Sequence, residues 1–300
     1  MTCSSHSKSF LDKAMDFPSP AKINLFLHIV GQRDDGYHNL ETLFQFIDHS
    51  DTITLTATET PEIKLLTPIE GVNNEDNLIV KAARLLKHKS NTTLGVKISI
   101  NKILPMGGGL GGGSSNAATV LVALNTLWQC QLSLSELALL GVSLGADVPI
   151  FIHGFSAFAQ GVGDQLTSIE PQEYWYLITK PECSISTQQV FTATDLPRNT
   201  KRLSPSALRT SDFINDNFHN DCQTLVIKHY PEVAKLLAWL VEYAPSRMTG
   251  TGACVFTRFS SLQEAHSLQA KLPKGISSFV AQGLNKSPLC SVIAKLSLYK

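Results

Sequence analysis

The stretch Pro105–Ala118, with the sequence PMGGGLGGGSSNAA, decides how this chain is interpreted. Six of the seven residues from 107 to 113 are glycine. Glycine weakens the interior of a helix or a strand, so this cluster indicates a backbone that needs conformations, or a close approach, that side chains would forbid. Consecutive exposed N–H groups followed by the positive end of a helix are typical of a phosphate-binding loop.

The flanking residues place this loop between a strand and a helix. Val96, Ile98 and Ile100 alternate with polar residues and predict a strand before it, and the apolar run from Asn116 to Trp128 predicts a helix after it. We expect the helix to begin at Ser114 or Ser115, with Ser-Ser-Asn capping its first turn. A flexible linker is disfavoured, because linkers do not stand directly before a strongly apolar helix.

The loop does not match the commonest nucleotide-binding motifs. It lacks the G-K-[ST] ending of a Walker A loop, and the chain has no H-R-D or D-F-G segment of a protein kinase. The dinucleotide spacing G-x-G-x-x-G is present, but six glycines make it nearly inevitable, and no acidic strand end follows about 20 positions on. The remaining inference is a nucleoside triphosphate held by backbone amides and a helix end.

The rest of the chain indicates an α+β fold of two domains. Alternating apolar residues predict an antiparallel meander of three strands, over residues 22–29, 43–47 and 53–57. We expect a mobile polar tail at residues 1–17, an N-terminal domain over 18–165, and a C-terminal domain over 166–300.

The composition excludes several classes of partner. Twenty-five Lys and Arg balance twenty-five Asp and Glu, which argues against binding to nucleic acid or to an anionic membrane. The six dispersed cysteines indicate neither a zinc cage nor a disulfide framework, and no apolar stretch is long enough for a signal peptide or a membrane span. We therefore expect a cytoplasmic protein with small-molecule partners; the sequence leaves its oligomeric state open.

Lys22 and Asp147 are charged residues in apolar surroundings. Each has an ordinary explanation, since a strand lysine often lies at a sheet edge and an aspartate in a turn is often a helix cap. If the two side chains meet, they suit phosphoryl transfer, which needs an acceptor for the proton of the nucleophile and a positive charge near the phosphoryl group.

Two further segments are open to two interpretations. Tyr37 and His38 lie on a turn, and are either an ordinary hairpin tip or a pair that stacks on a flat ligand and hydrogen-bonds its edge. The segment Thr249–Cys254, TGTGAC, is either a tight turn or a second phosphate-contacting loop.

Three segments together resemble the motifs of the GHMP small-molecule kinase family: Ser19–Leu25, Pro105–Ala118 and Thr249–Cys254. The resemblance implies a ribosomal-protein-like N-terminal domain, a ferredoxin-like C-terminal domain and an active site between them. Together with two further segments, Gly36–His38 and Gly145–Pro149, the resemblance also implies the reaction. The γ-phosphate of ATP passes to the tertiary 2-hydroxyl of a cytidyl diphosphate-methylerythritol, in non-mevalonate isoprenoid precursor biosynthesis.

The resemblance also implies the roles of individual residues. Asp147 matches the catalytic base, and Lys22 matches the lysine that orients it. The implied ATP-binding residues are Pro105, Met106, Gly107, Gly108, Gly109, Leu110, Gly111, Gly112, Gly113, Ser114 and Ser115, with Asn77 placed near the adenine by position. The implied substrate-binding residues are Asn24, Tyr37, His38, Phe191, Thr251 and Gly252. Mg²⁺ is the implied cofactor, with Ser115, or its neighbour Ser114, as a ligand.

Other functions are compatible with parts of the pattern. Within the family, a homoserine or mevalonate kinase is the alternative, and Gly36-Tyr37-His38 argues against it. Outside the family, a nicotinamide dehydrogenase or a nucleotide sensor without catalytic activity would also carry a glycine-rich loop.

Overall fold

A computed structural model describes residues 10–204, 207–209, 213, 215 and 217–298. The elements follow in the order β1 (Ala14–Gln32), β2 (His38–Thr58), β3 (Ile63–Leu65), α1 (Leu78–Ser90), β4 (Gly95–Asn101), α2 (Gly112–Leu127), α3 (Leu134–Val142), α4 (Val148–His153), β5 (Ala157–Gln160), β6 (Gln165–Ser168), β7 (Trp175–Lys180), α5 (Thr187–Thr192), η2 (Ala207–Arg209), α6 (Asp221–His229), α7 (Pro231–Val241), β8 (Ser246–Met248), β9 (Val255–Phe259), α8 (Leu262–Gln269), β10 (Ser277–Leu284) and α9 (Pro288–Ser297). In the described part of the chain, no helix has the length and apolar character needed to cross a membrane.

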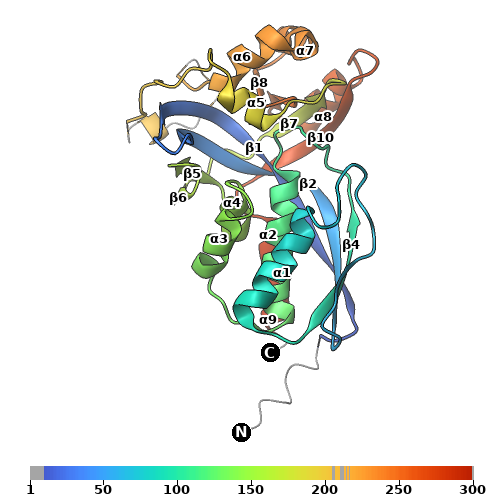
Figure 1. The fold of residues 1–300 in the computed structure, drawn as a ribbon. Helices are drawn as coiled ribbons and strands as arrows, with labels where there is room; N and C mark the ends of the chain where they lie inside the picture. Colours follow the sequence, from blue (N-terminus) through green and yellow to red (C-terminus); the bar gives the residue numbers. More distant parts are fainter. Residues whose placement is uncertain (1–9, 205–206, 210–212, 214, 216, 299–300) are drawn as a thin grey trace.

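The long strand β2 connects the two halves of the molecule. It pairs with β1, β4 and β5 in the first half and, over two residues, with β10, which continues the sheet into β7, β9 and β8. Figure 1 shows α1 to α4 together in one half, α5 to α8 in the other, and β1 and β2 passing between them. The predicted α+β class is confirmed.

The predicted break between two strands at residues 47–53 is wrong, because β2 runs through it. The β1–β2 register shifts between Pro20 and Ala21, so that Pro20 faces Ser50 and Ala21 faces Ile47. Asp48 and His49 therefore form a bulge that interrupts the alternation of apolar residues without ending the strand.

The sequence-based domain division at residue 165 falls inside a hairpin. Strand β6 begins at Gln165 and pairs with β5, so this hairpin of the first half continues to Ser168. The last helix, α9, also returns to the first half, where Leu289 and Leu296 join its hydrophobic core. The second half has its own core, formed mainly by β7 to β9 and the helices α5 to α8.

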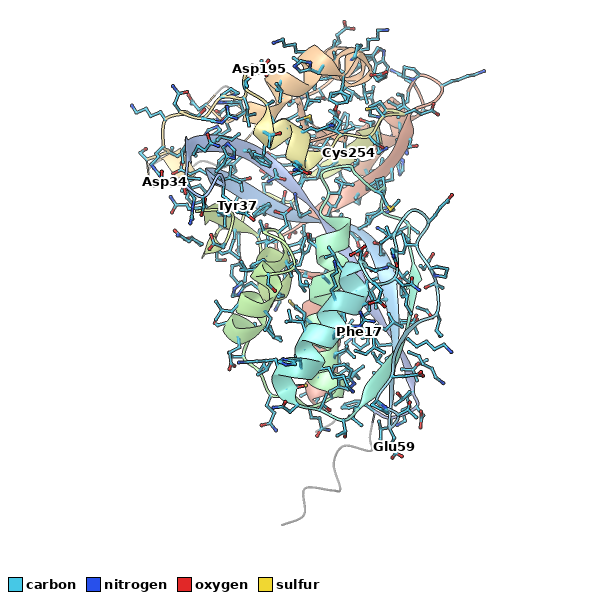
Figure 2. All side chains as sticks on the ribbon, viewed as in Figure 1. Phe17, Asp34, Tyr37, Glu59, Asp195 and Cys254 are labelled. Atoms are coloured by element: carbon cyan, nitrogen blue, oxygen red, sulfur yellow. The ribbon has the colours of Figure 1, made fainter. Side chains whose placement is uncertain are left out.

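The expected mobile tail is wrong for residues 10–17; residues 1–9 lie outside the described part. Strand β1 begins at Ala14 and pairs with β2, and Phe10 and Phe17 are buried. Phe17 belongs to the first core and lies close to α1 and α2 in the view of Figure 2. Phe10 and Phe17 stand among mostly polar residues, so no periodic apolar pattern predicted that they would be buried.

We expect Phe17→Ala to lower the free energy of unfolding by about 3–5 kcal/mol, the usual cost of emptying a fully buried phenylalanine site. Urea unfolding measures this difference. Asp16→Ala, on the exposed side of the same strand, is the control and should cost less than about 1 kcal/mol, because it loses a single hydrogen bond from Thr54. Equal costs for both variants would contradict the packed position of Phe17.

Candidate active site

The glycine loop begins a helix through its backbone rather than through a side-chain cap. Helix α2 starts at Gly112, and its N-cap Gly111 has φ 73°, a left-handed conformation that glycine adopts without strain. The expectation that Ser114 to Asn116 cap the helix is therefore wrong. Ser115 and Asn116 are instead buried one turn inside α2.

The segment Thr249–Cys254 forms a tight turn that supports the glycine loop. Its Ala253 and Cys254 amides donate to the carbonyls of Gly107 and Gly108, at 3.2 and 3.3 Å. Within the turn, the Gly252 amide donates to the carbonyl of Thr249. These three amides are therefore occupied and cannot hold a phosphate, and the turn supports the glycine loop; Gly250 and Thr251 of the same turn line the cavity.

Burial of this turn also determines the state of its thiol. Cys254 is fully buried, and burial raises its pKa to about 12. The thiol therefore stays protonated at neutral pH and packs against the glycine loop rather than acting as a nucleophile. The described cysteines, which exclude Cys3, are all free.

Lys22 and Asp147 meet, although 125 positions separate them in the chain. The Lys22 Nζ lies 3.4 Å from Asp147 Oδ2, and it also donates to Asn24 Oδ1 at 2.7 Å and to the Gly109 carbonyl at 2.9 Å. These three acceptors fix a nearly buried ammonium between β1, the glycine loop and the start of α4. Asp147 is the N-cap residue of α4 but makes no capping bond, so its carboxylate remains available for chemistry.

A buried cluster around Asp51 holds both ends of the glycine loop, and sequence reasoning missed it. The fully buried carboxylate accepts from Lys102 Nζ at 2.7 Å, from the amides of Ile103 and Leu104 at 2.8 Å each, and from Asn116 Nδ2 at 2.9 Å. Residues 102–104 precede the loop and Asn116 follows it. Asp51 stands between Ser50 and Thr52 in β2, so neither an apolar alternation nor a known motif marks it in the sequence.

We expect Asp51→Asn to raise the KM for ATP about tenfold and to lower the free energy of unfolding by about 2–3 kcal/mol. Asparagine keeps one oxygen acceptor but carries no charge, and its N–H₂ group would oppose either the ammonium of Lys102 or the amides of Ile103 and Leu104. Steady-state kinetics and urea unfolding check both effects. Asp48→Asn, an exposed change on the same strand, should leave both values near wild type. An unchanged KM for ATP would show that the cluster does not position the loop.

The aromatic residues lie at the other end of the same cavity. Tyr37 is largely exposed at the tip of the β1–β2 turn, where Asp34 also lies (Figure 2). The His38 ring packs against the Phe191 ring of α5, with 5.3 Å between centroids. The turn is therefore a hairpin tip and also borders the cavity, so the two interpretations of Tyr37 and His38 are compatible.

One cavity of about 850 Å³ connects these groups. Of the predicted site residues, those that line it are Lys22, Asn24, Tyr37, His38, Asn77, Pro105, Met106, Gly107, Gly108, Gly109, Leu110, Gly111, Gly112, Gly113, Ser114, Asp147, Phe191 and Thr251. Asn77 caps α1 through its Oδ1, and its buried Nδ2 has no partner within the described residues. Lys102 and Thr187 also line the cavity and were missed from the sequence.

Two predicted site residues lie outside this lining. Ser115 is fully buried, and its Oγ accepts a hydrogen bond from Ser19 at 2.9 Å, so the expectation that it ligates a metal is wrong in this arrangement. Gly252 is buried and its amide donates to the carbonyl of Thr249, so its expected substrate contact stays a prediction.

The site lacks a preformed metal cage. Among the described residues, no group of three or more His, Cys, Asp or Glu side chains could hold an ion. Ser114 offers a hydroxyl oxygen in the cavity, and Mg²⁺ commonly takes one or two protein oxygens and completes its shell with phosphates and water. The residues present therefore fit a metal that arrives with a nucleotide.

Comparison with known families decides the classification. The model of the GHMP kinases N terminal domain matches residues 77–155, and that of the GHMP kinases C terminal domain matches residues 206–277. A protein of Colwellia psychrerythraea named 4-diphosphocytidyl-2-C-methyl-D-erythritol kinase is 86% identical over 298 residues, which cover 99% of either chain. The chain belongs to the GHMP kinase family.

Further relatives of this GHMP kinase carry the same description. A Shewanella pealeana protein with the same name is 56% identical, covering 94% of this chain and 98% of its own. A crystal structure of 4-(cytidine 5'-diphospho)-2C-methyl-D-erythritol kinase superimposes with a TM-score of 0.78 at 28% identity, covering 90% of this chain and 99% of that chain. A homoserine kinase from Cytophaga hutchinsonii, 16% identical with a TM-score of 0.65, covers 93% of this chain and 97% of its own; it shares the fold.

Proposed function

We propose that this GHMP kinase transfers the γ-phosphoryl group of ATP to the 2-hydroxyl of 4-diphosphocytidyl-2-C-methyl-D-erythritol, giving the 2-phosphate and ADP. The observation that carries the proposal is a single cavity with a glycine loop, a Lys22–Asp147 ion pair and an aromatic end. The 86% identity to the Colwellia kinase supports the same substrate.

The residues of the chain suggest how the reaction proceeds. Asp147 accepts the proton of the substrate hydroxyl, whose oxygen then forms a bond to the γ-phosphorus while the bond to the bridging oxygen of ADP breaks. The ammonium of Lys22 holds the carboxylate in place and stabilises the negative charge that develops on the transferred group. Asn24 bonds both Lys22 and Thr42, which fixes this end of β1.

The glycine loop and its neighbours would hold the nucleotide. The amides of residues 111–114 lie at the positive end of α2, where a phosphate is favoured. Lys102 adds a cation beside Gly112, since a Cβ there would stand 3.1 Å from its Nζ. Ser114 would offer its hydroxyl oxygen to Mg²⁺, which when bound would neutralise charge on the phosphates. Asn77 is proposed to donate its free Nδ2 hydrogen to the adenine.

The opposite end of the cavity would take the cytidine. Tyr37 and Phe191 offer aromatic faces for stacking, His38 offers a hydrogen-bonding edge, and Thr251 offers a hydroxyl that pairs with Thr187 at 3.0 Å. A site of action in the cytoplasm remains a prediction that rests on the dispersed cysteines.

Measurement of ADP release with a panel of alcohols tests the proposal. We expect turnover with the cytidyl methylerythritol substrate, and turnover at least about 100-fold lower with homoserine, mevalonate and methylerythritol phosphate, which lack the cytidine. Faster turnover of a substrate without cytidine than of the cytidyl methylerythritol substrate would overturn the proposal. Binding of ATP with no ADP release under any alcohol would instead favour a nucleotide sensor.

A further inference from the structure

His38 receives a hydrogen bond that determines which of its ring nitrogens carries a proton. The Nε of Arg198 lies 3.1 Å from the Nε2 of His38. A guanidinium has donors and no acceptor at any pH that a folded protein tolerates. The Nε2 must therefore present its lone pair, and the neutral ring carries its proton on Nδ1.

The position of Arg198 is itself fixed by the backbone. Its Nη1 and Nη2 groups donate to the carbonyls of Leu196 and Ala193 at 2.9 and 2.6 Å, and Nη2 also approaches the carbonyl of Phe191 at 3.3 Å. The same guanidinium therefore holds the end of α5, which carries Phe191, and the edge of His38. These bonds define a unit that we call the Arg198 clamp: Arg198, His38 and Phe191.

The surroundings of His38 leave Arg198 as its charged neighbour. Its register partner on β1 is the uncharged Gln32, and α5 contributes the ring of Phe191. In the turn, Arg33 and Asp35 pair with each other. Burial, and then the charge of Arg198, lower the pKa of His38 from its ordinary value of 6.5, which agrees with a neutral ring.

The free nitrogen of His38 is left for a ligand. His38 is 7% exposed and lines the cavity, and within the described part of the chain its Nδ1 has no hydrogen-bond partner. A donor at the cavity wall without a protein partner favours a ligand atom that accepts and disfavours one that donates.

We propose that Arg198 is a positioning residue that locks His38 in the Nδ1–H tautomer and thereby makes this end of the cavity selective for a hydrogen-bond acceptor on the base. The inference rests on the proposed function for the identity of that base, a pyrimidine with a carbonyl oxygen and an unprotonated ring nitrogen on its edge. The tautomer itself does not depend on the substrate.

Long-range ¹H–¹⁵N NMR of the free enzyme tests the tautomer directly, with the His38 signals assigned by their loss in His38→Gln. At pH 7 we expect a protonated Nδ1 and an unprotonated Nε2. In Arg198→Met, which removes the donor and the charge, we expect a mixture of the two tautomers and a pKa closer to 6.5. A wild-type ring protonated on Nε2 would overturn the proposal even if the cytidyl substrate is turned over.

Kinetics tests the consequence for binding, through a pH signature that loosened packing would not produce. At pH 8 we expect Arg198→Met to raise the KM for the cytidyl substrate about fivefold, because only the fraction of rings that keeps Nδ1–H, about a fifth, can donate to the acceptor. At pH 5.5 most His38 rings of the variant carry a proton on both nitrogens, so that Nδ1–H is present again. The ratio of the variant KM to the wild-type KM should therefore fall about threefold or more between pH 8 and pH 5.5.

Arg202→Met is the matched control. Arg202 lies in the same segment and pairs with Glu41 on β2 at 3.3 Å, without contact to His38. It should leave the His38 spectrum unchanged and give a KM ratio that is constant with pH. A constant ratio in Arg198→Met as well would show that Arg198 only supports packing. Absence of any turnover with the cytidyl substrate would contradict the proposed function and leave the NMR result to decide the tautomer.

Discussion

Replacing Asp147 with asparagine is expected to lower kcat by a factor of about 1000 while ATP still binds. The substitution keeps the size and shape of the side chain but removes the group that accepts the proton of the substrate hydroxyl. Because Asp147 makes no capping hydrogen bond to α4, the change removes no bond that holds the helix. Lys22, which pairs with the Asp147 carboxylate, keeps two other acceptors, the Asn24 side chain and the Gly109 carbonyl, and should stay in place.

Three measurements separate a chemical effect from a structural one. Single-turnover phosphoryl transfer reports the chemical step, calorimetric titration reports the affinity for ATP, and urea unfolding reports stability. Asp48→Asn, the same chemical change at an exposed position of β2, should behave as wild type in all three. Single-turnover transfer within tenfold of wild type in Asp147→Asn would assign proton acceptance to another group.

Replacing Gly109 with alanine is expected to raise the KM for ATP, and lower kcat/KM, about 100-fold or more. A Cβ at this position would stand 2.2 Å from the carbonyl oxygen of Thr249, so the glycine loop and the turn behind it must separate. Gly109 also provides the carbonyl that accepts from Lys22, so a shift of the loop moves the catalytic ammonium as well. A displacement of about 1 Å at such a site is enough for a loss of this size.

A second glycine separates this clash from the cost of the backbone conformation. Gly71 has φ +74°, against +73° for Gly109, and a Cβ there meets no atom within 4 Å. Gly71→Ala therefore carries the same left-handed strain, about 1–2 kcal/mol, outside the cavity lining. It should lower stability and leave KM near wild type. Similar KM values in the two alanine variants would show that the contact with Thr249 does not shape the loop.

The local pattern of residues was sufficient for most elements and for the character of the site. A dense glycine cluster before an apolar helix indicates a phosphate loop, because the reason lies in the backbone of consecutive residues. The capping boxes of α3 and α8 are likewise local: Ser133 with Glu136, and Ser261 with Glu264.

The errors arose where a distant segment changed the local preference. The residues before Pro18 are mostly polar, yet Phe17 is held in β1 by a partner strand that lies 36 positions away, at Ile53. The capping role expected for Ser115 and Asn116 is lost to Ser19 and Asp51, which bond their side chains inside the core. A buried polar side chain takes its partner from whatever the fold brings near it.

The sequence by itself determined that this chain has an α+β fold, a loop of bare amides for a phosphate, and the residue types that phosphoryl transfer requires. The tertiary structure alone decided which of those residues meet: Lys22 with Asp147, Asp51 with both ends of the loop, and Arg198 with His38. The reason is that backbone conformation follows from neighbouring residues, whereas hydrogen bonds and ion pairs between side chains depend on distances in space that residues far apart in the chain acquire only on folding.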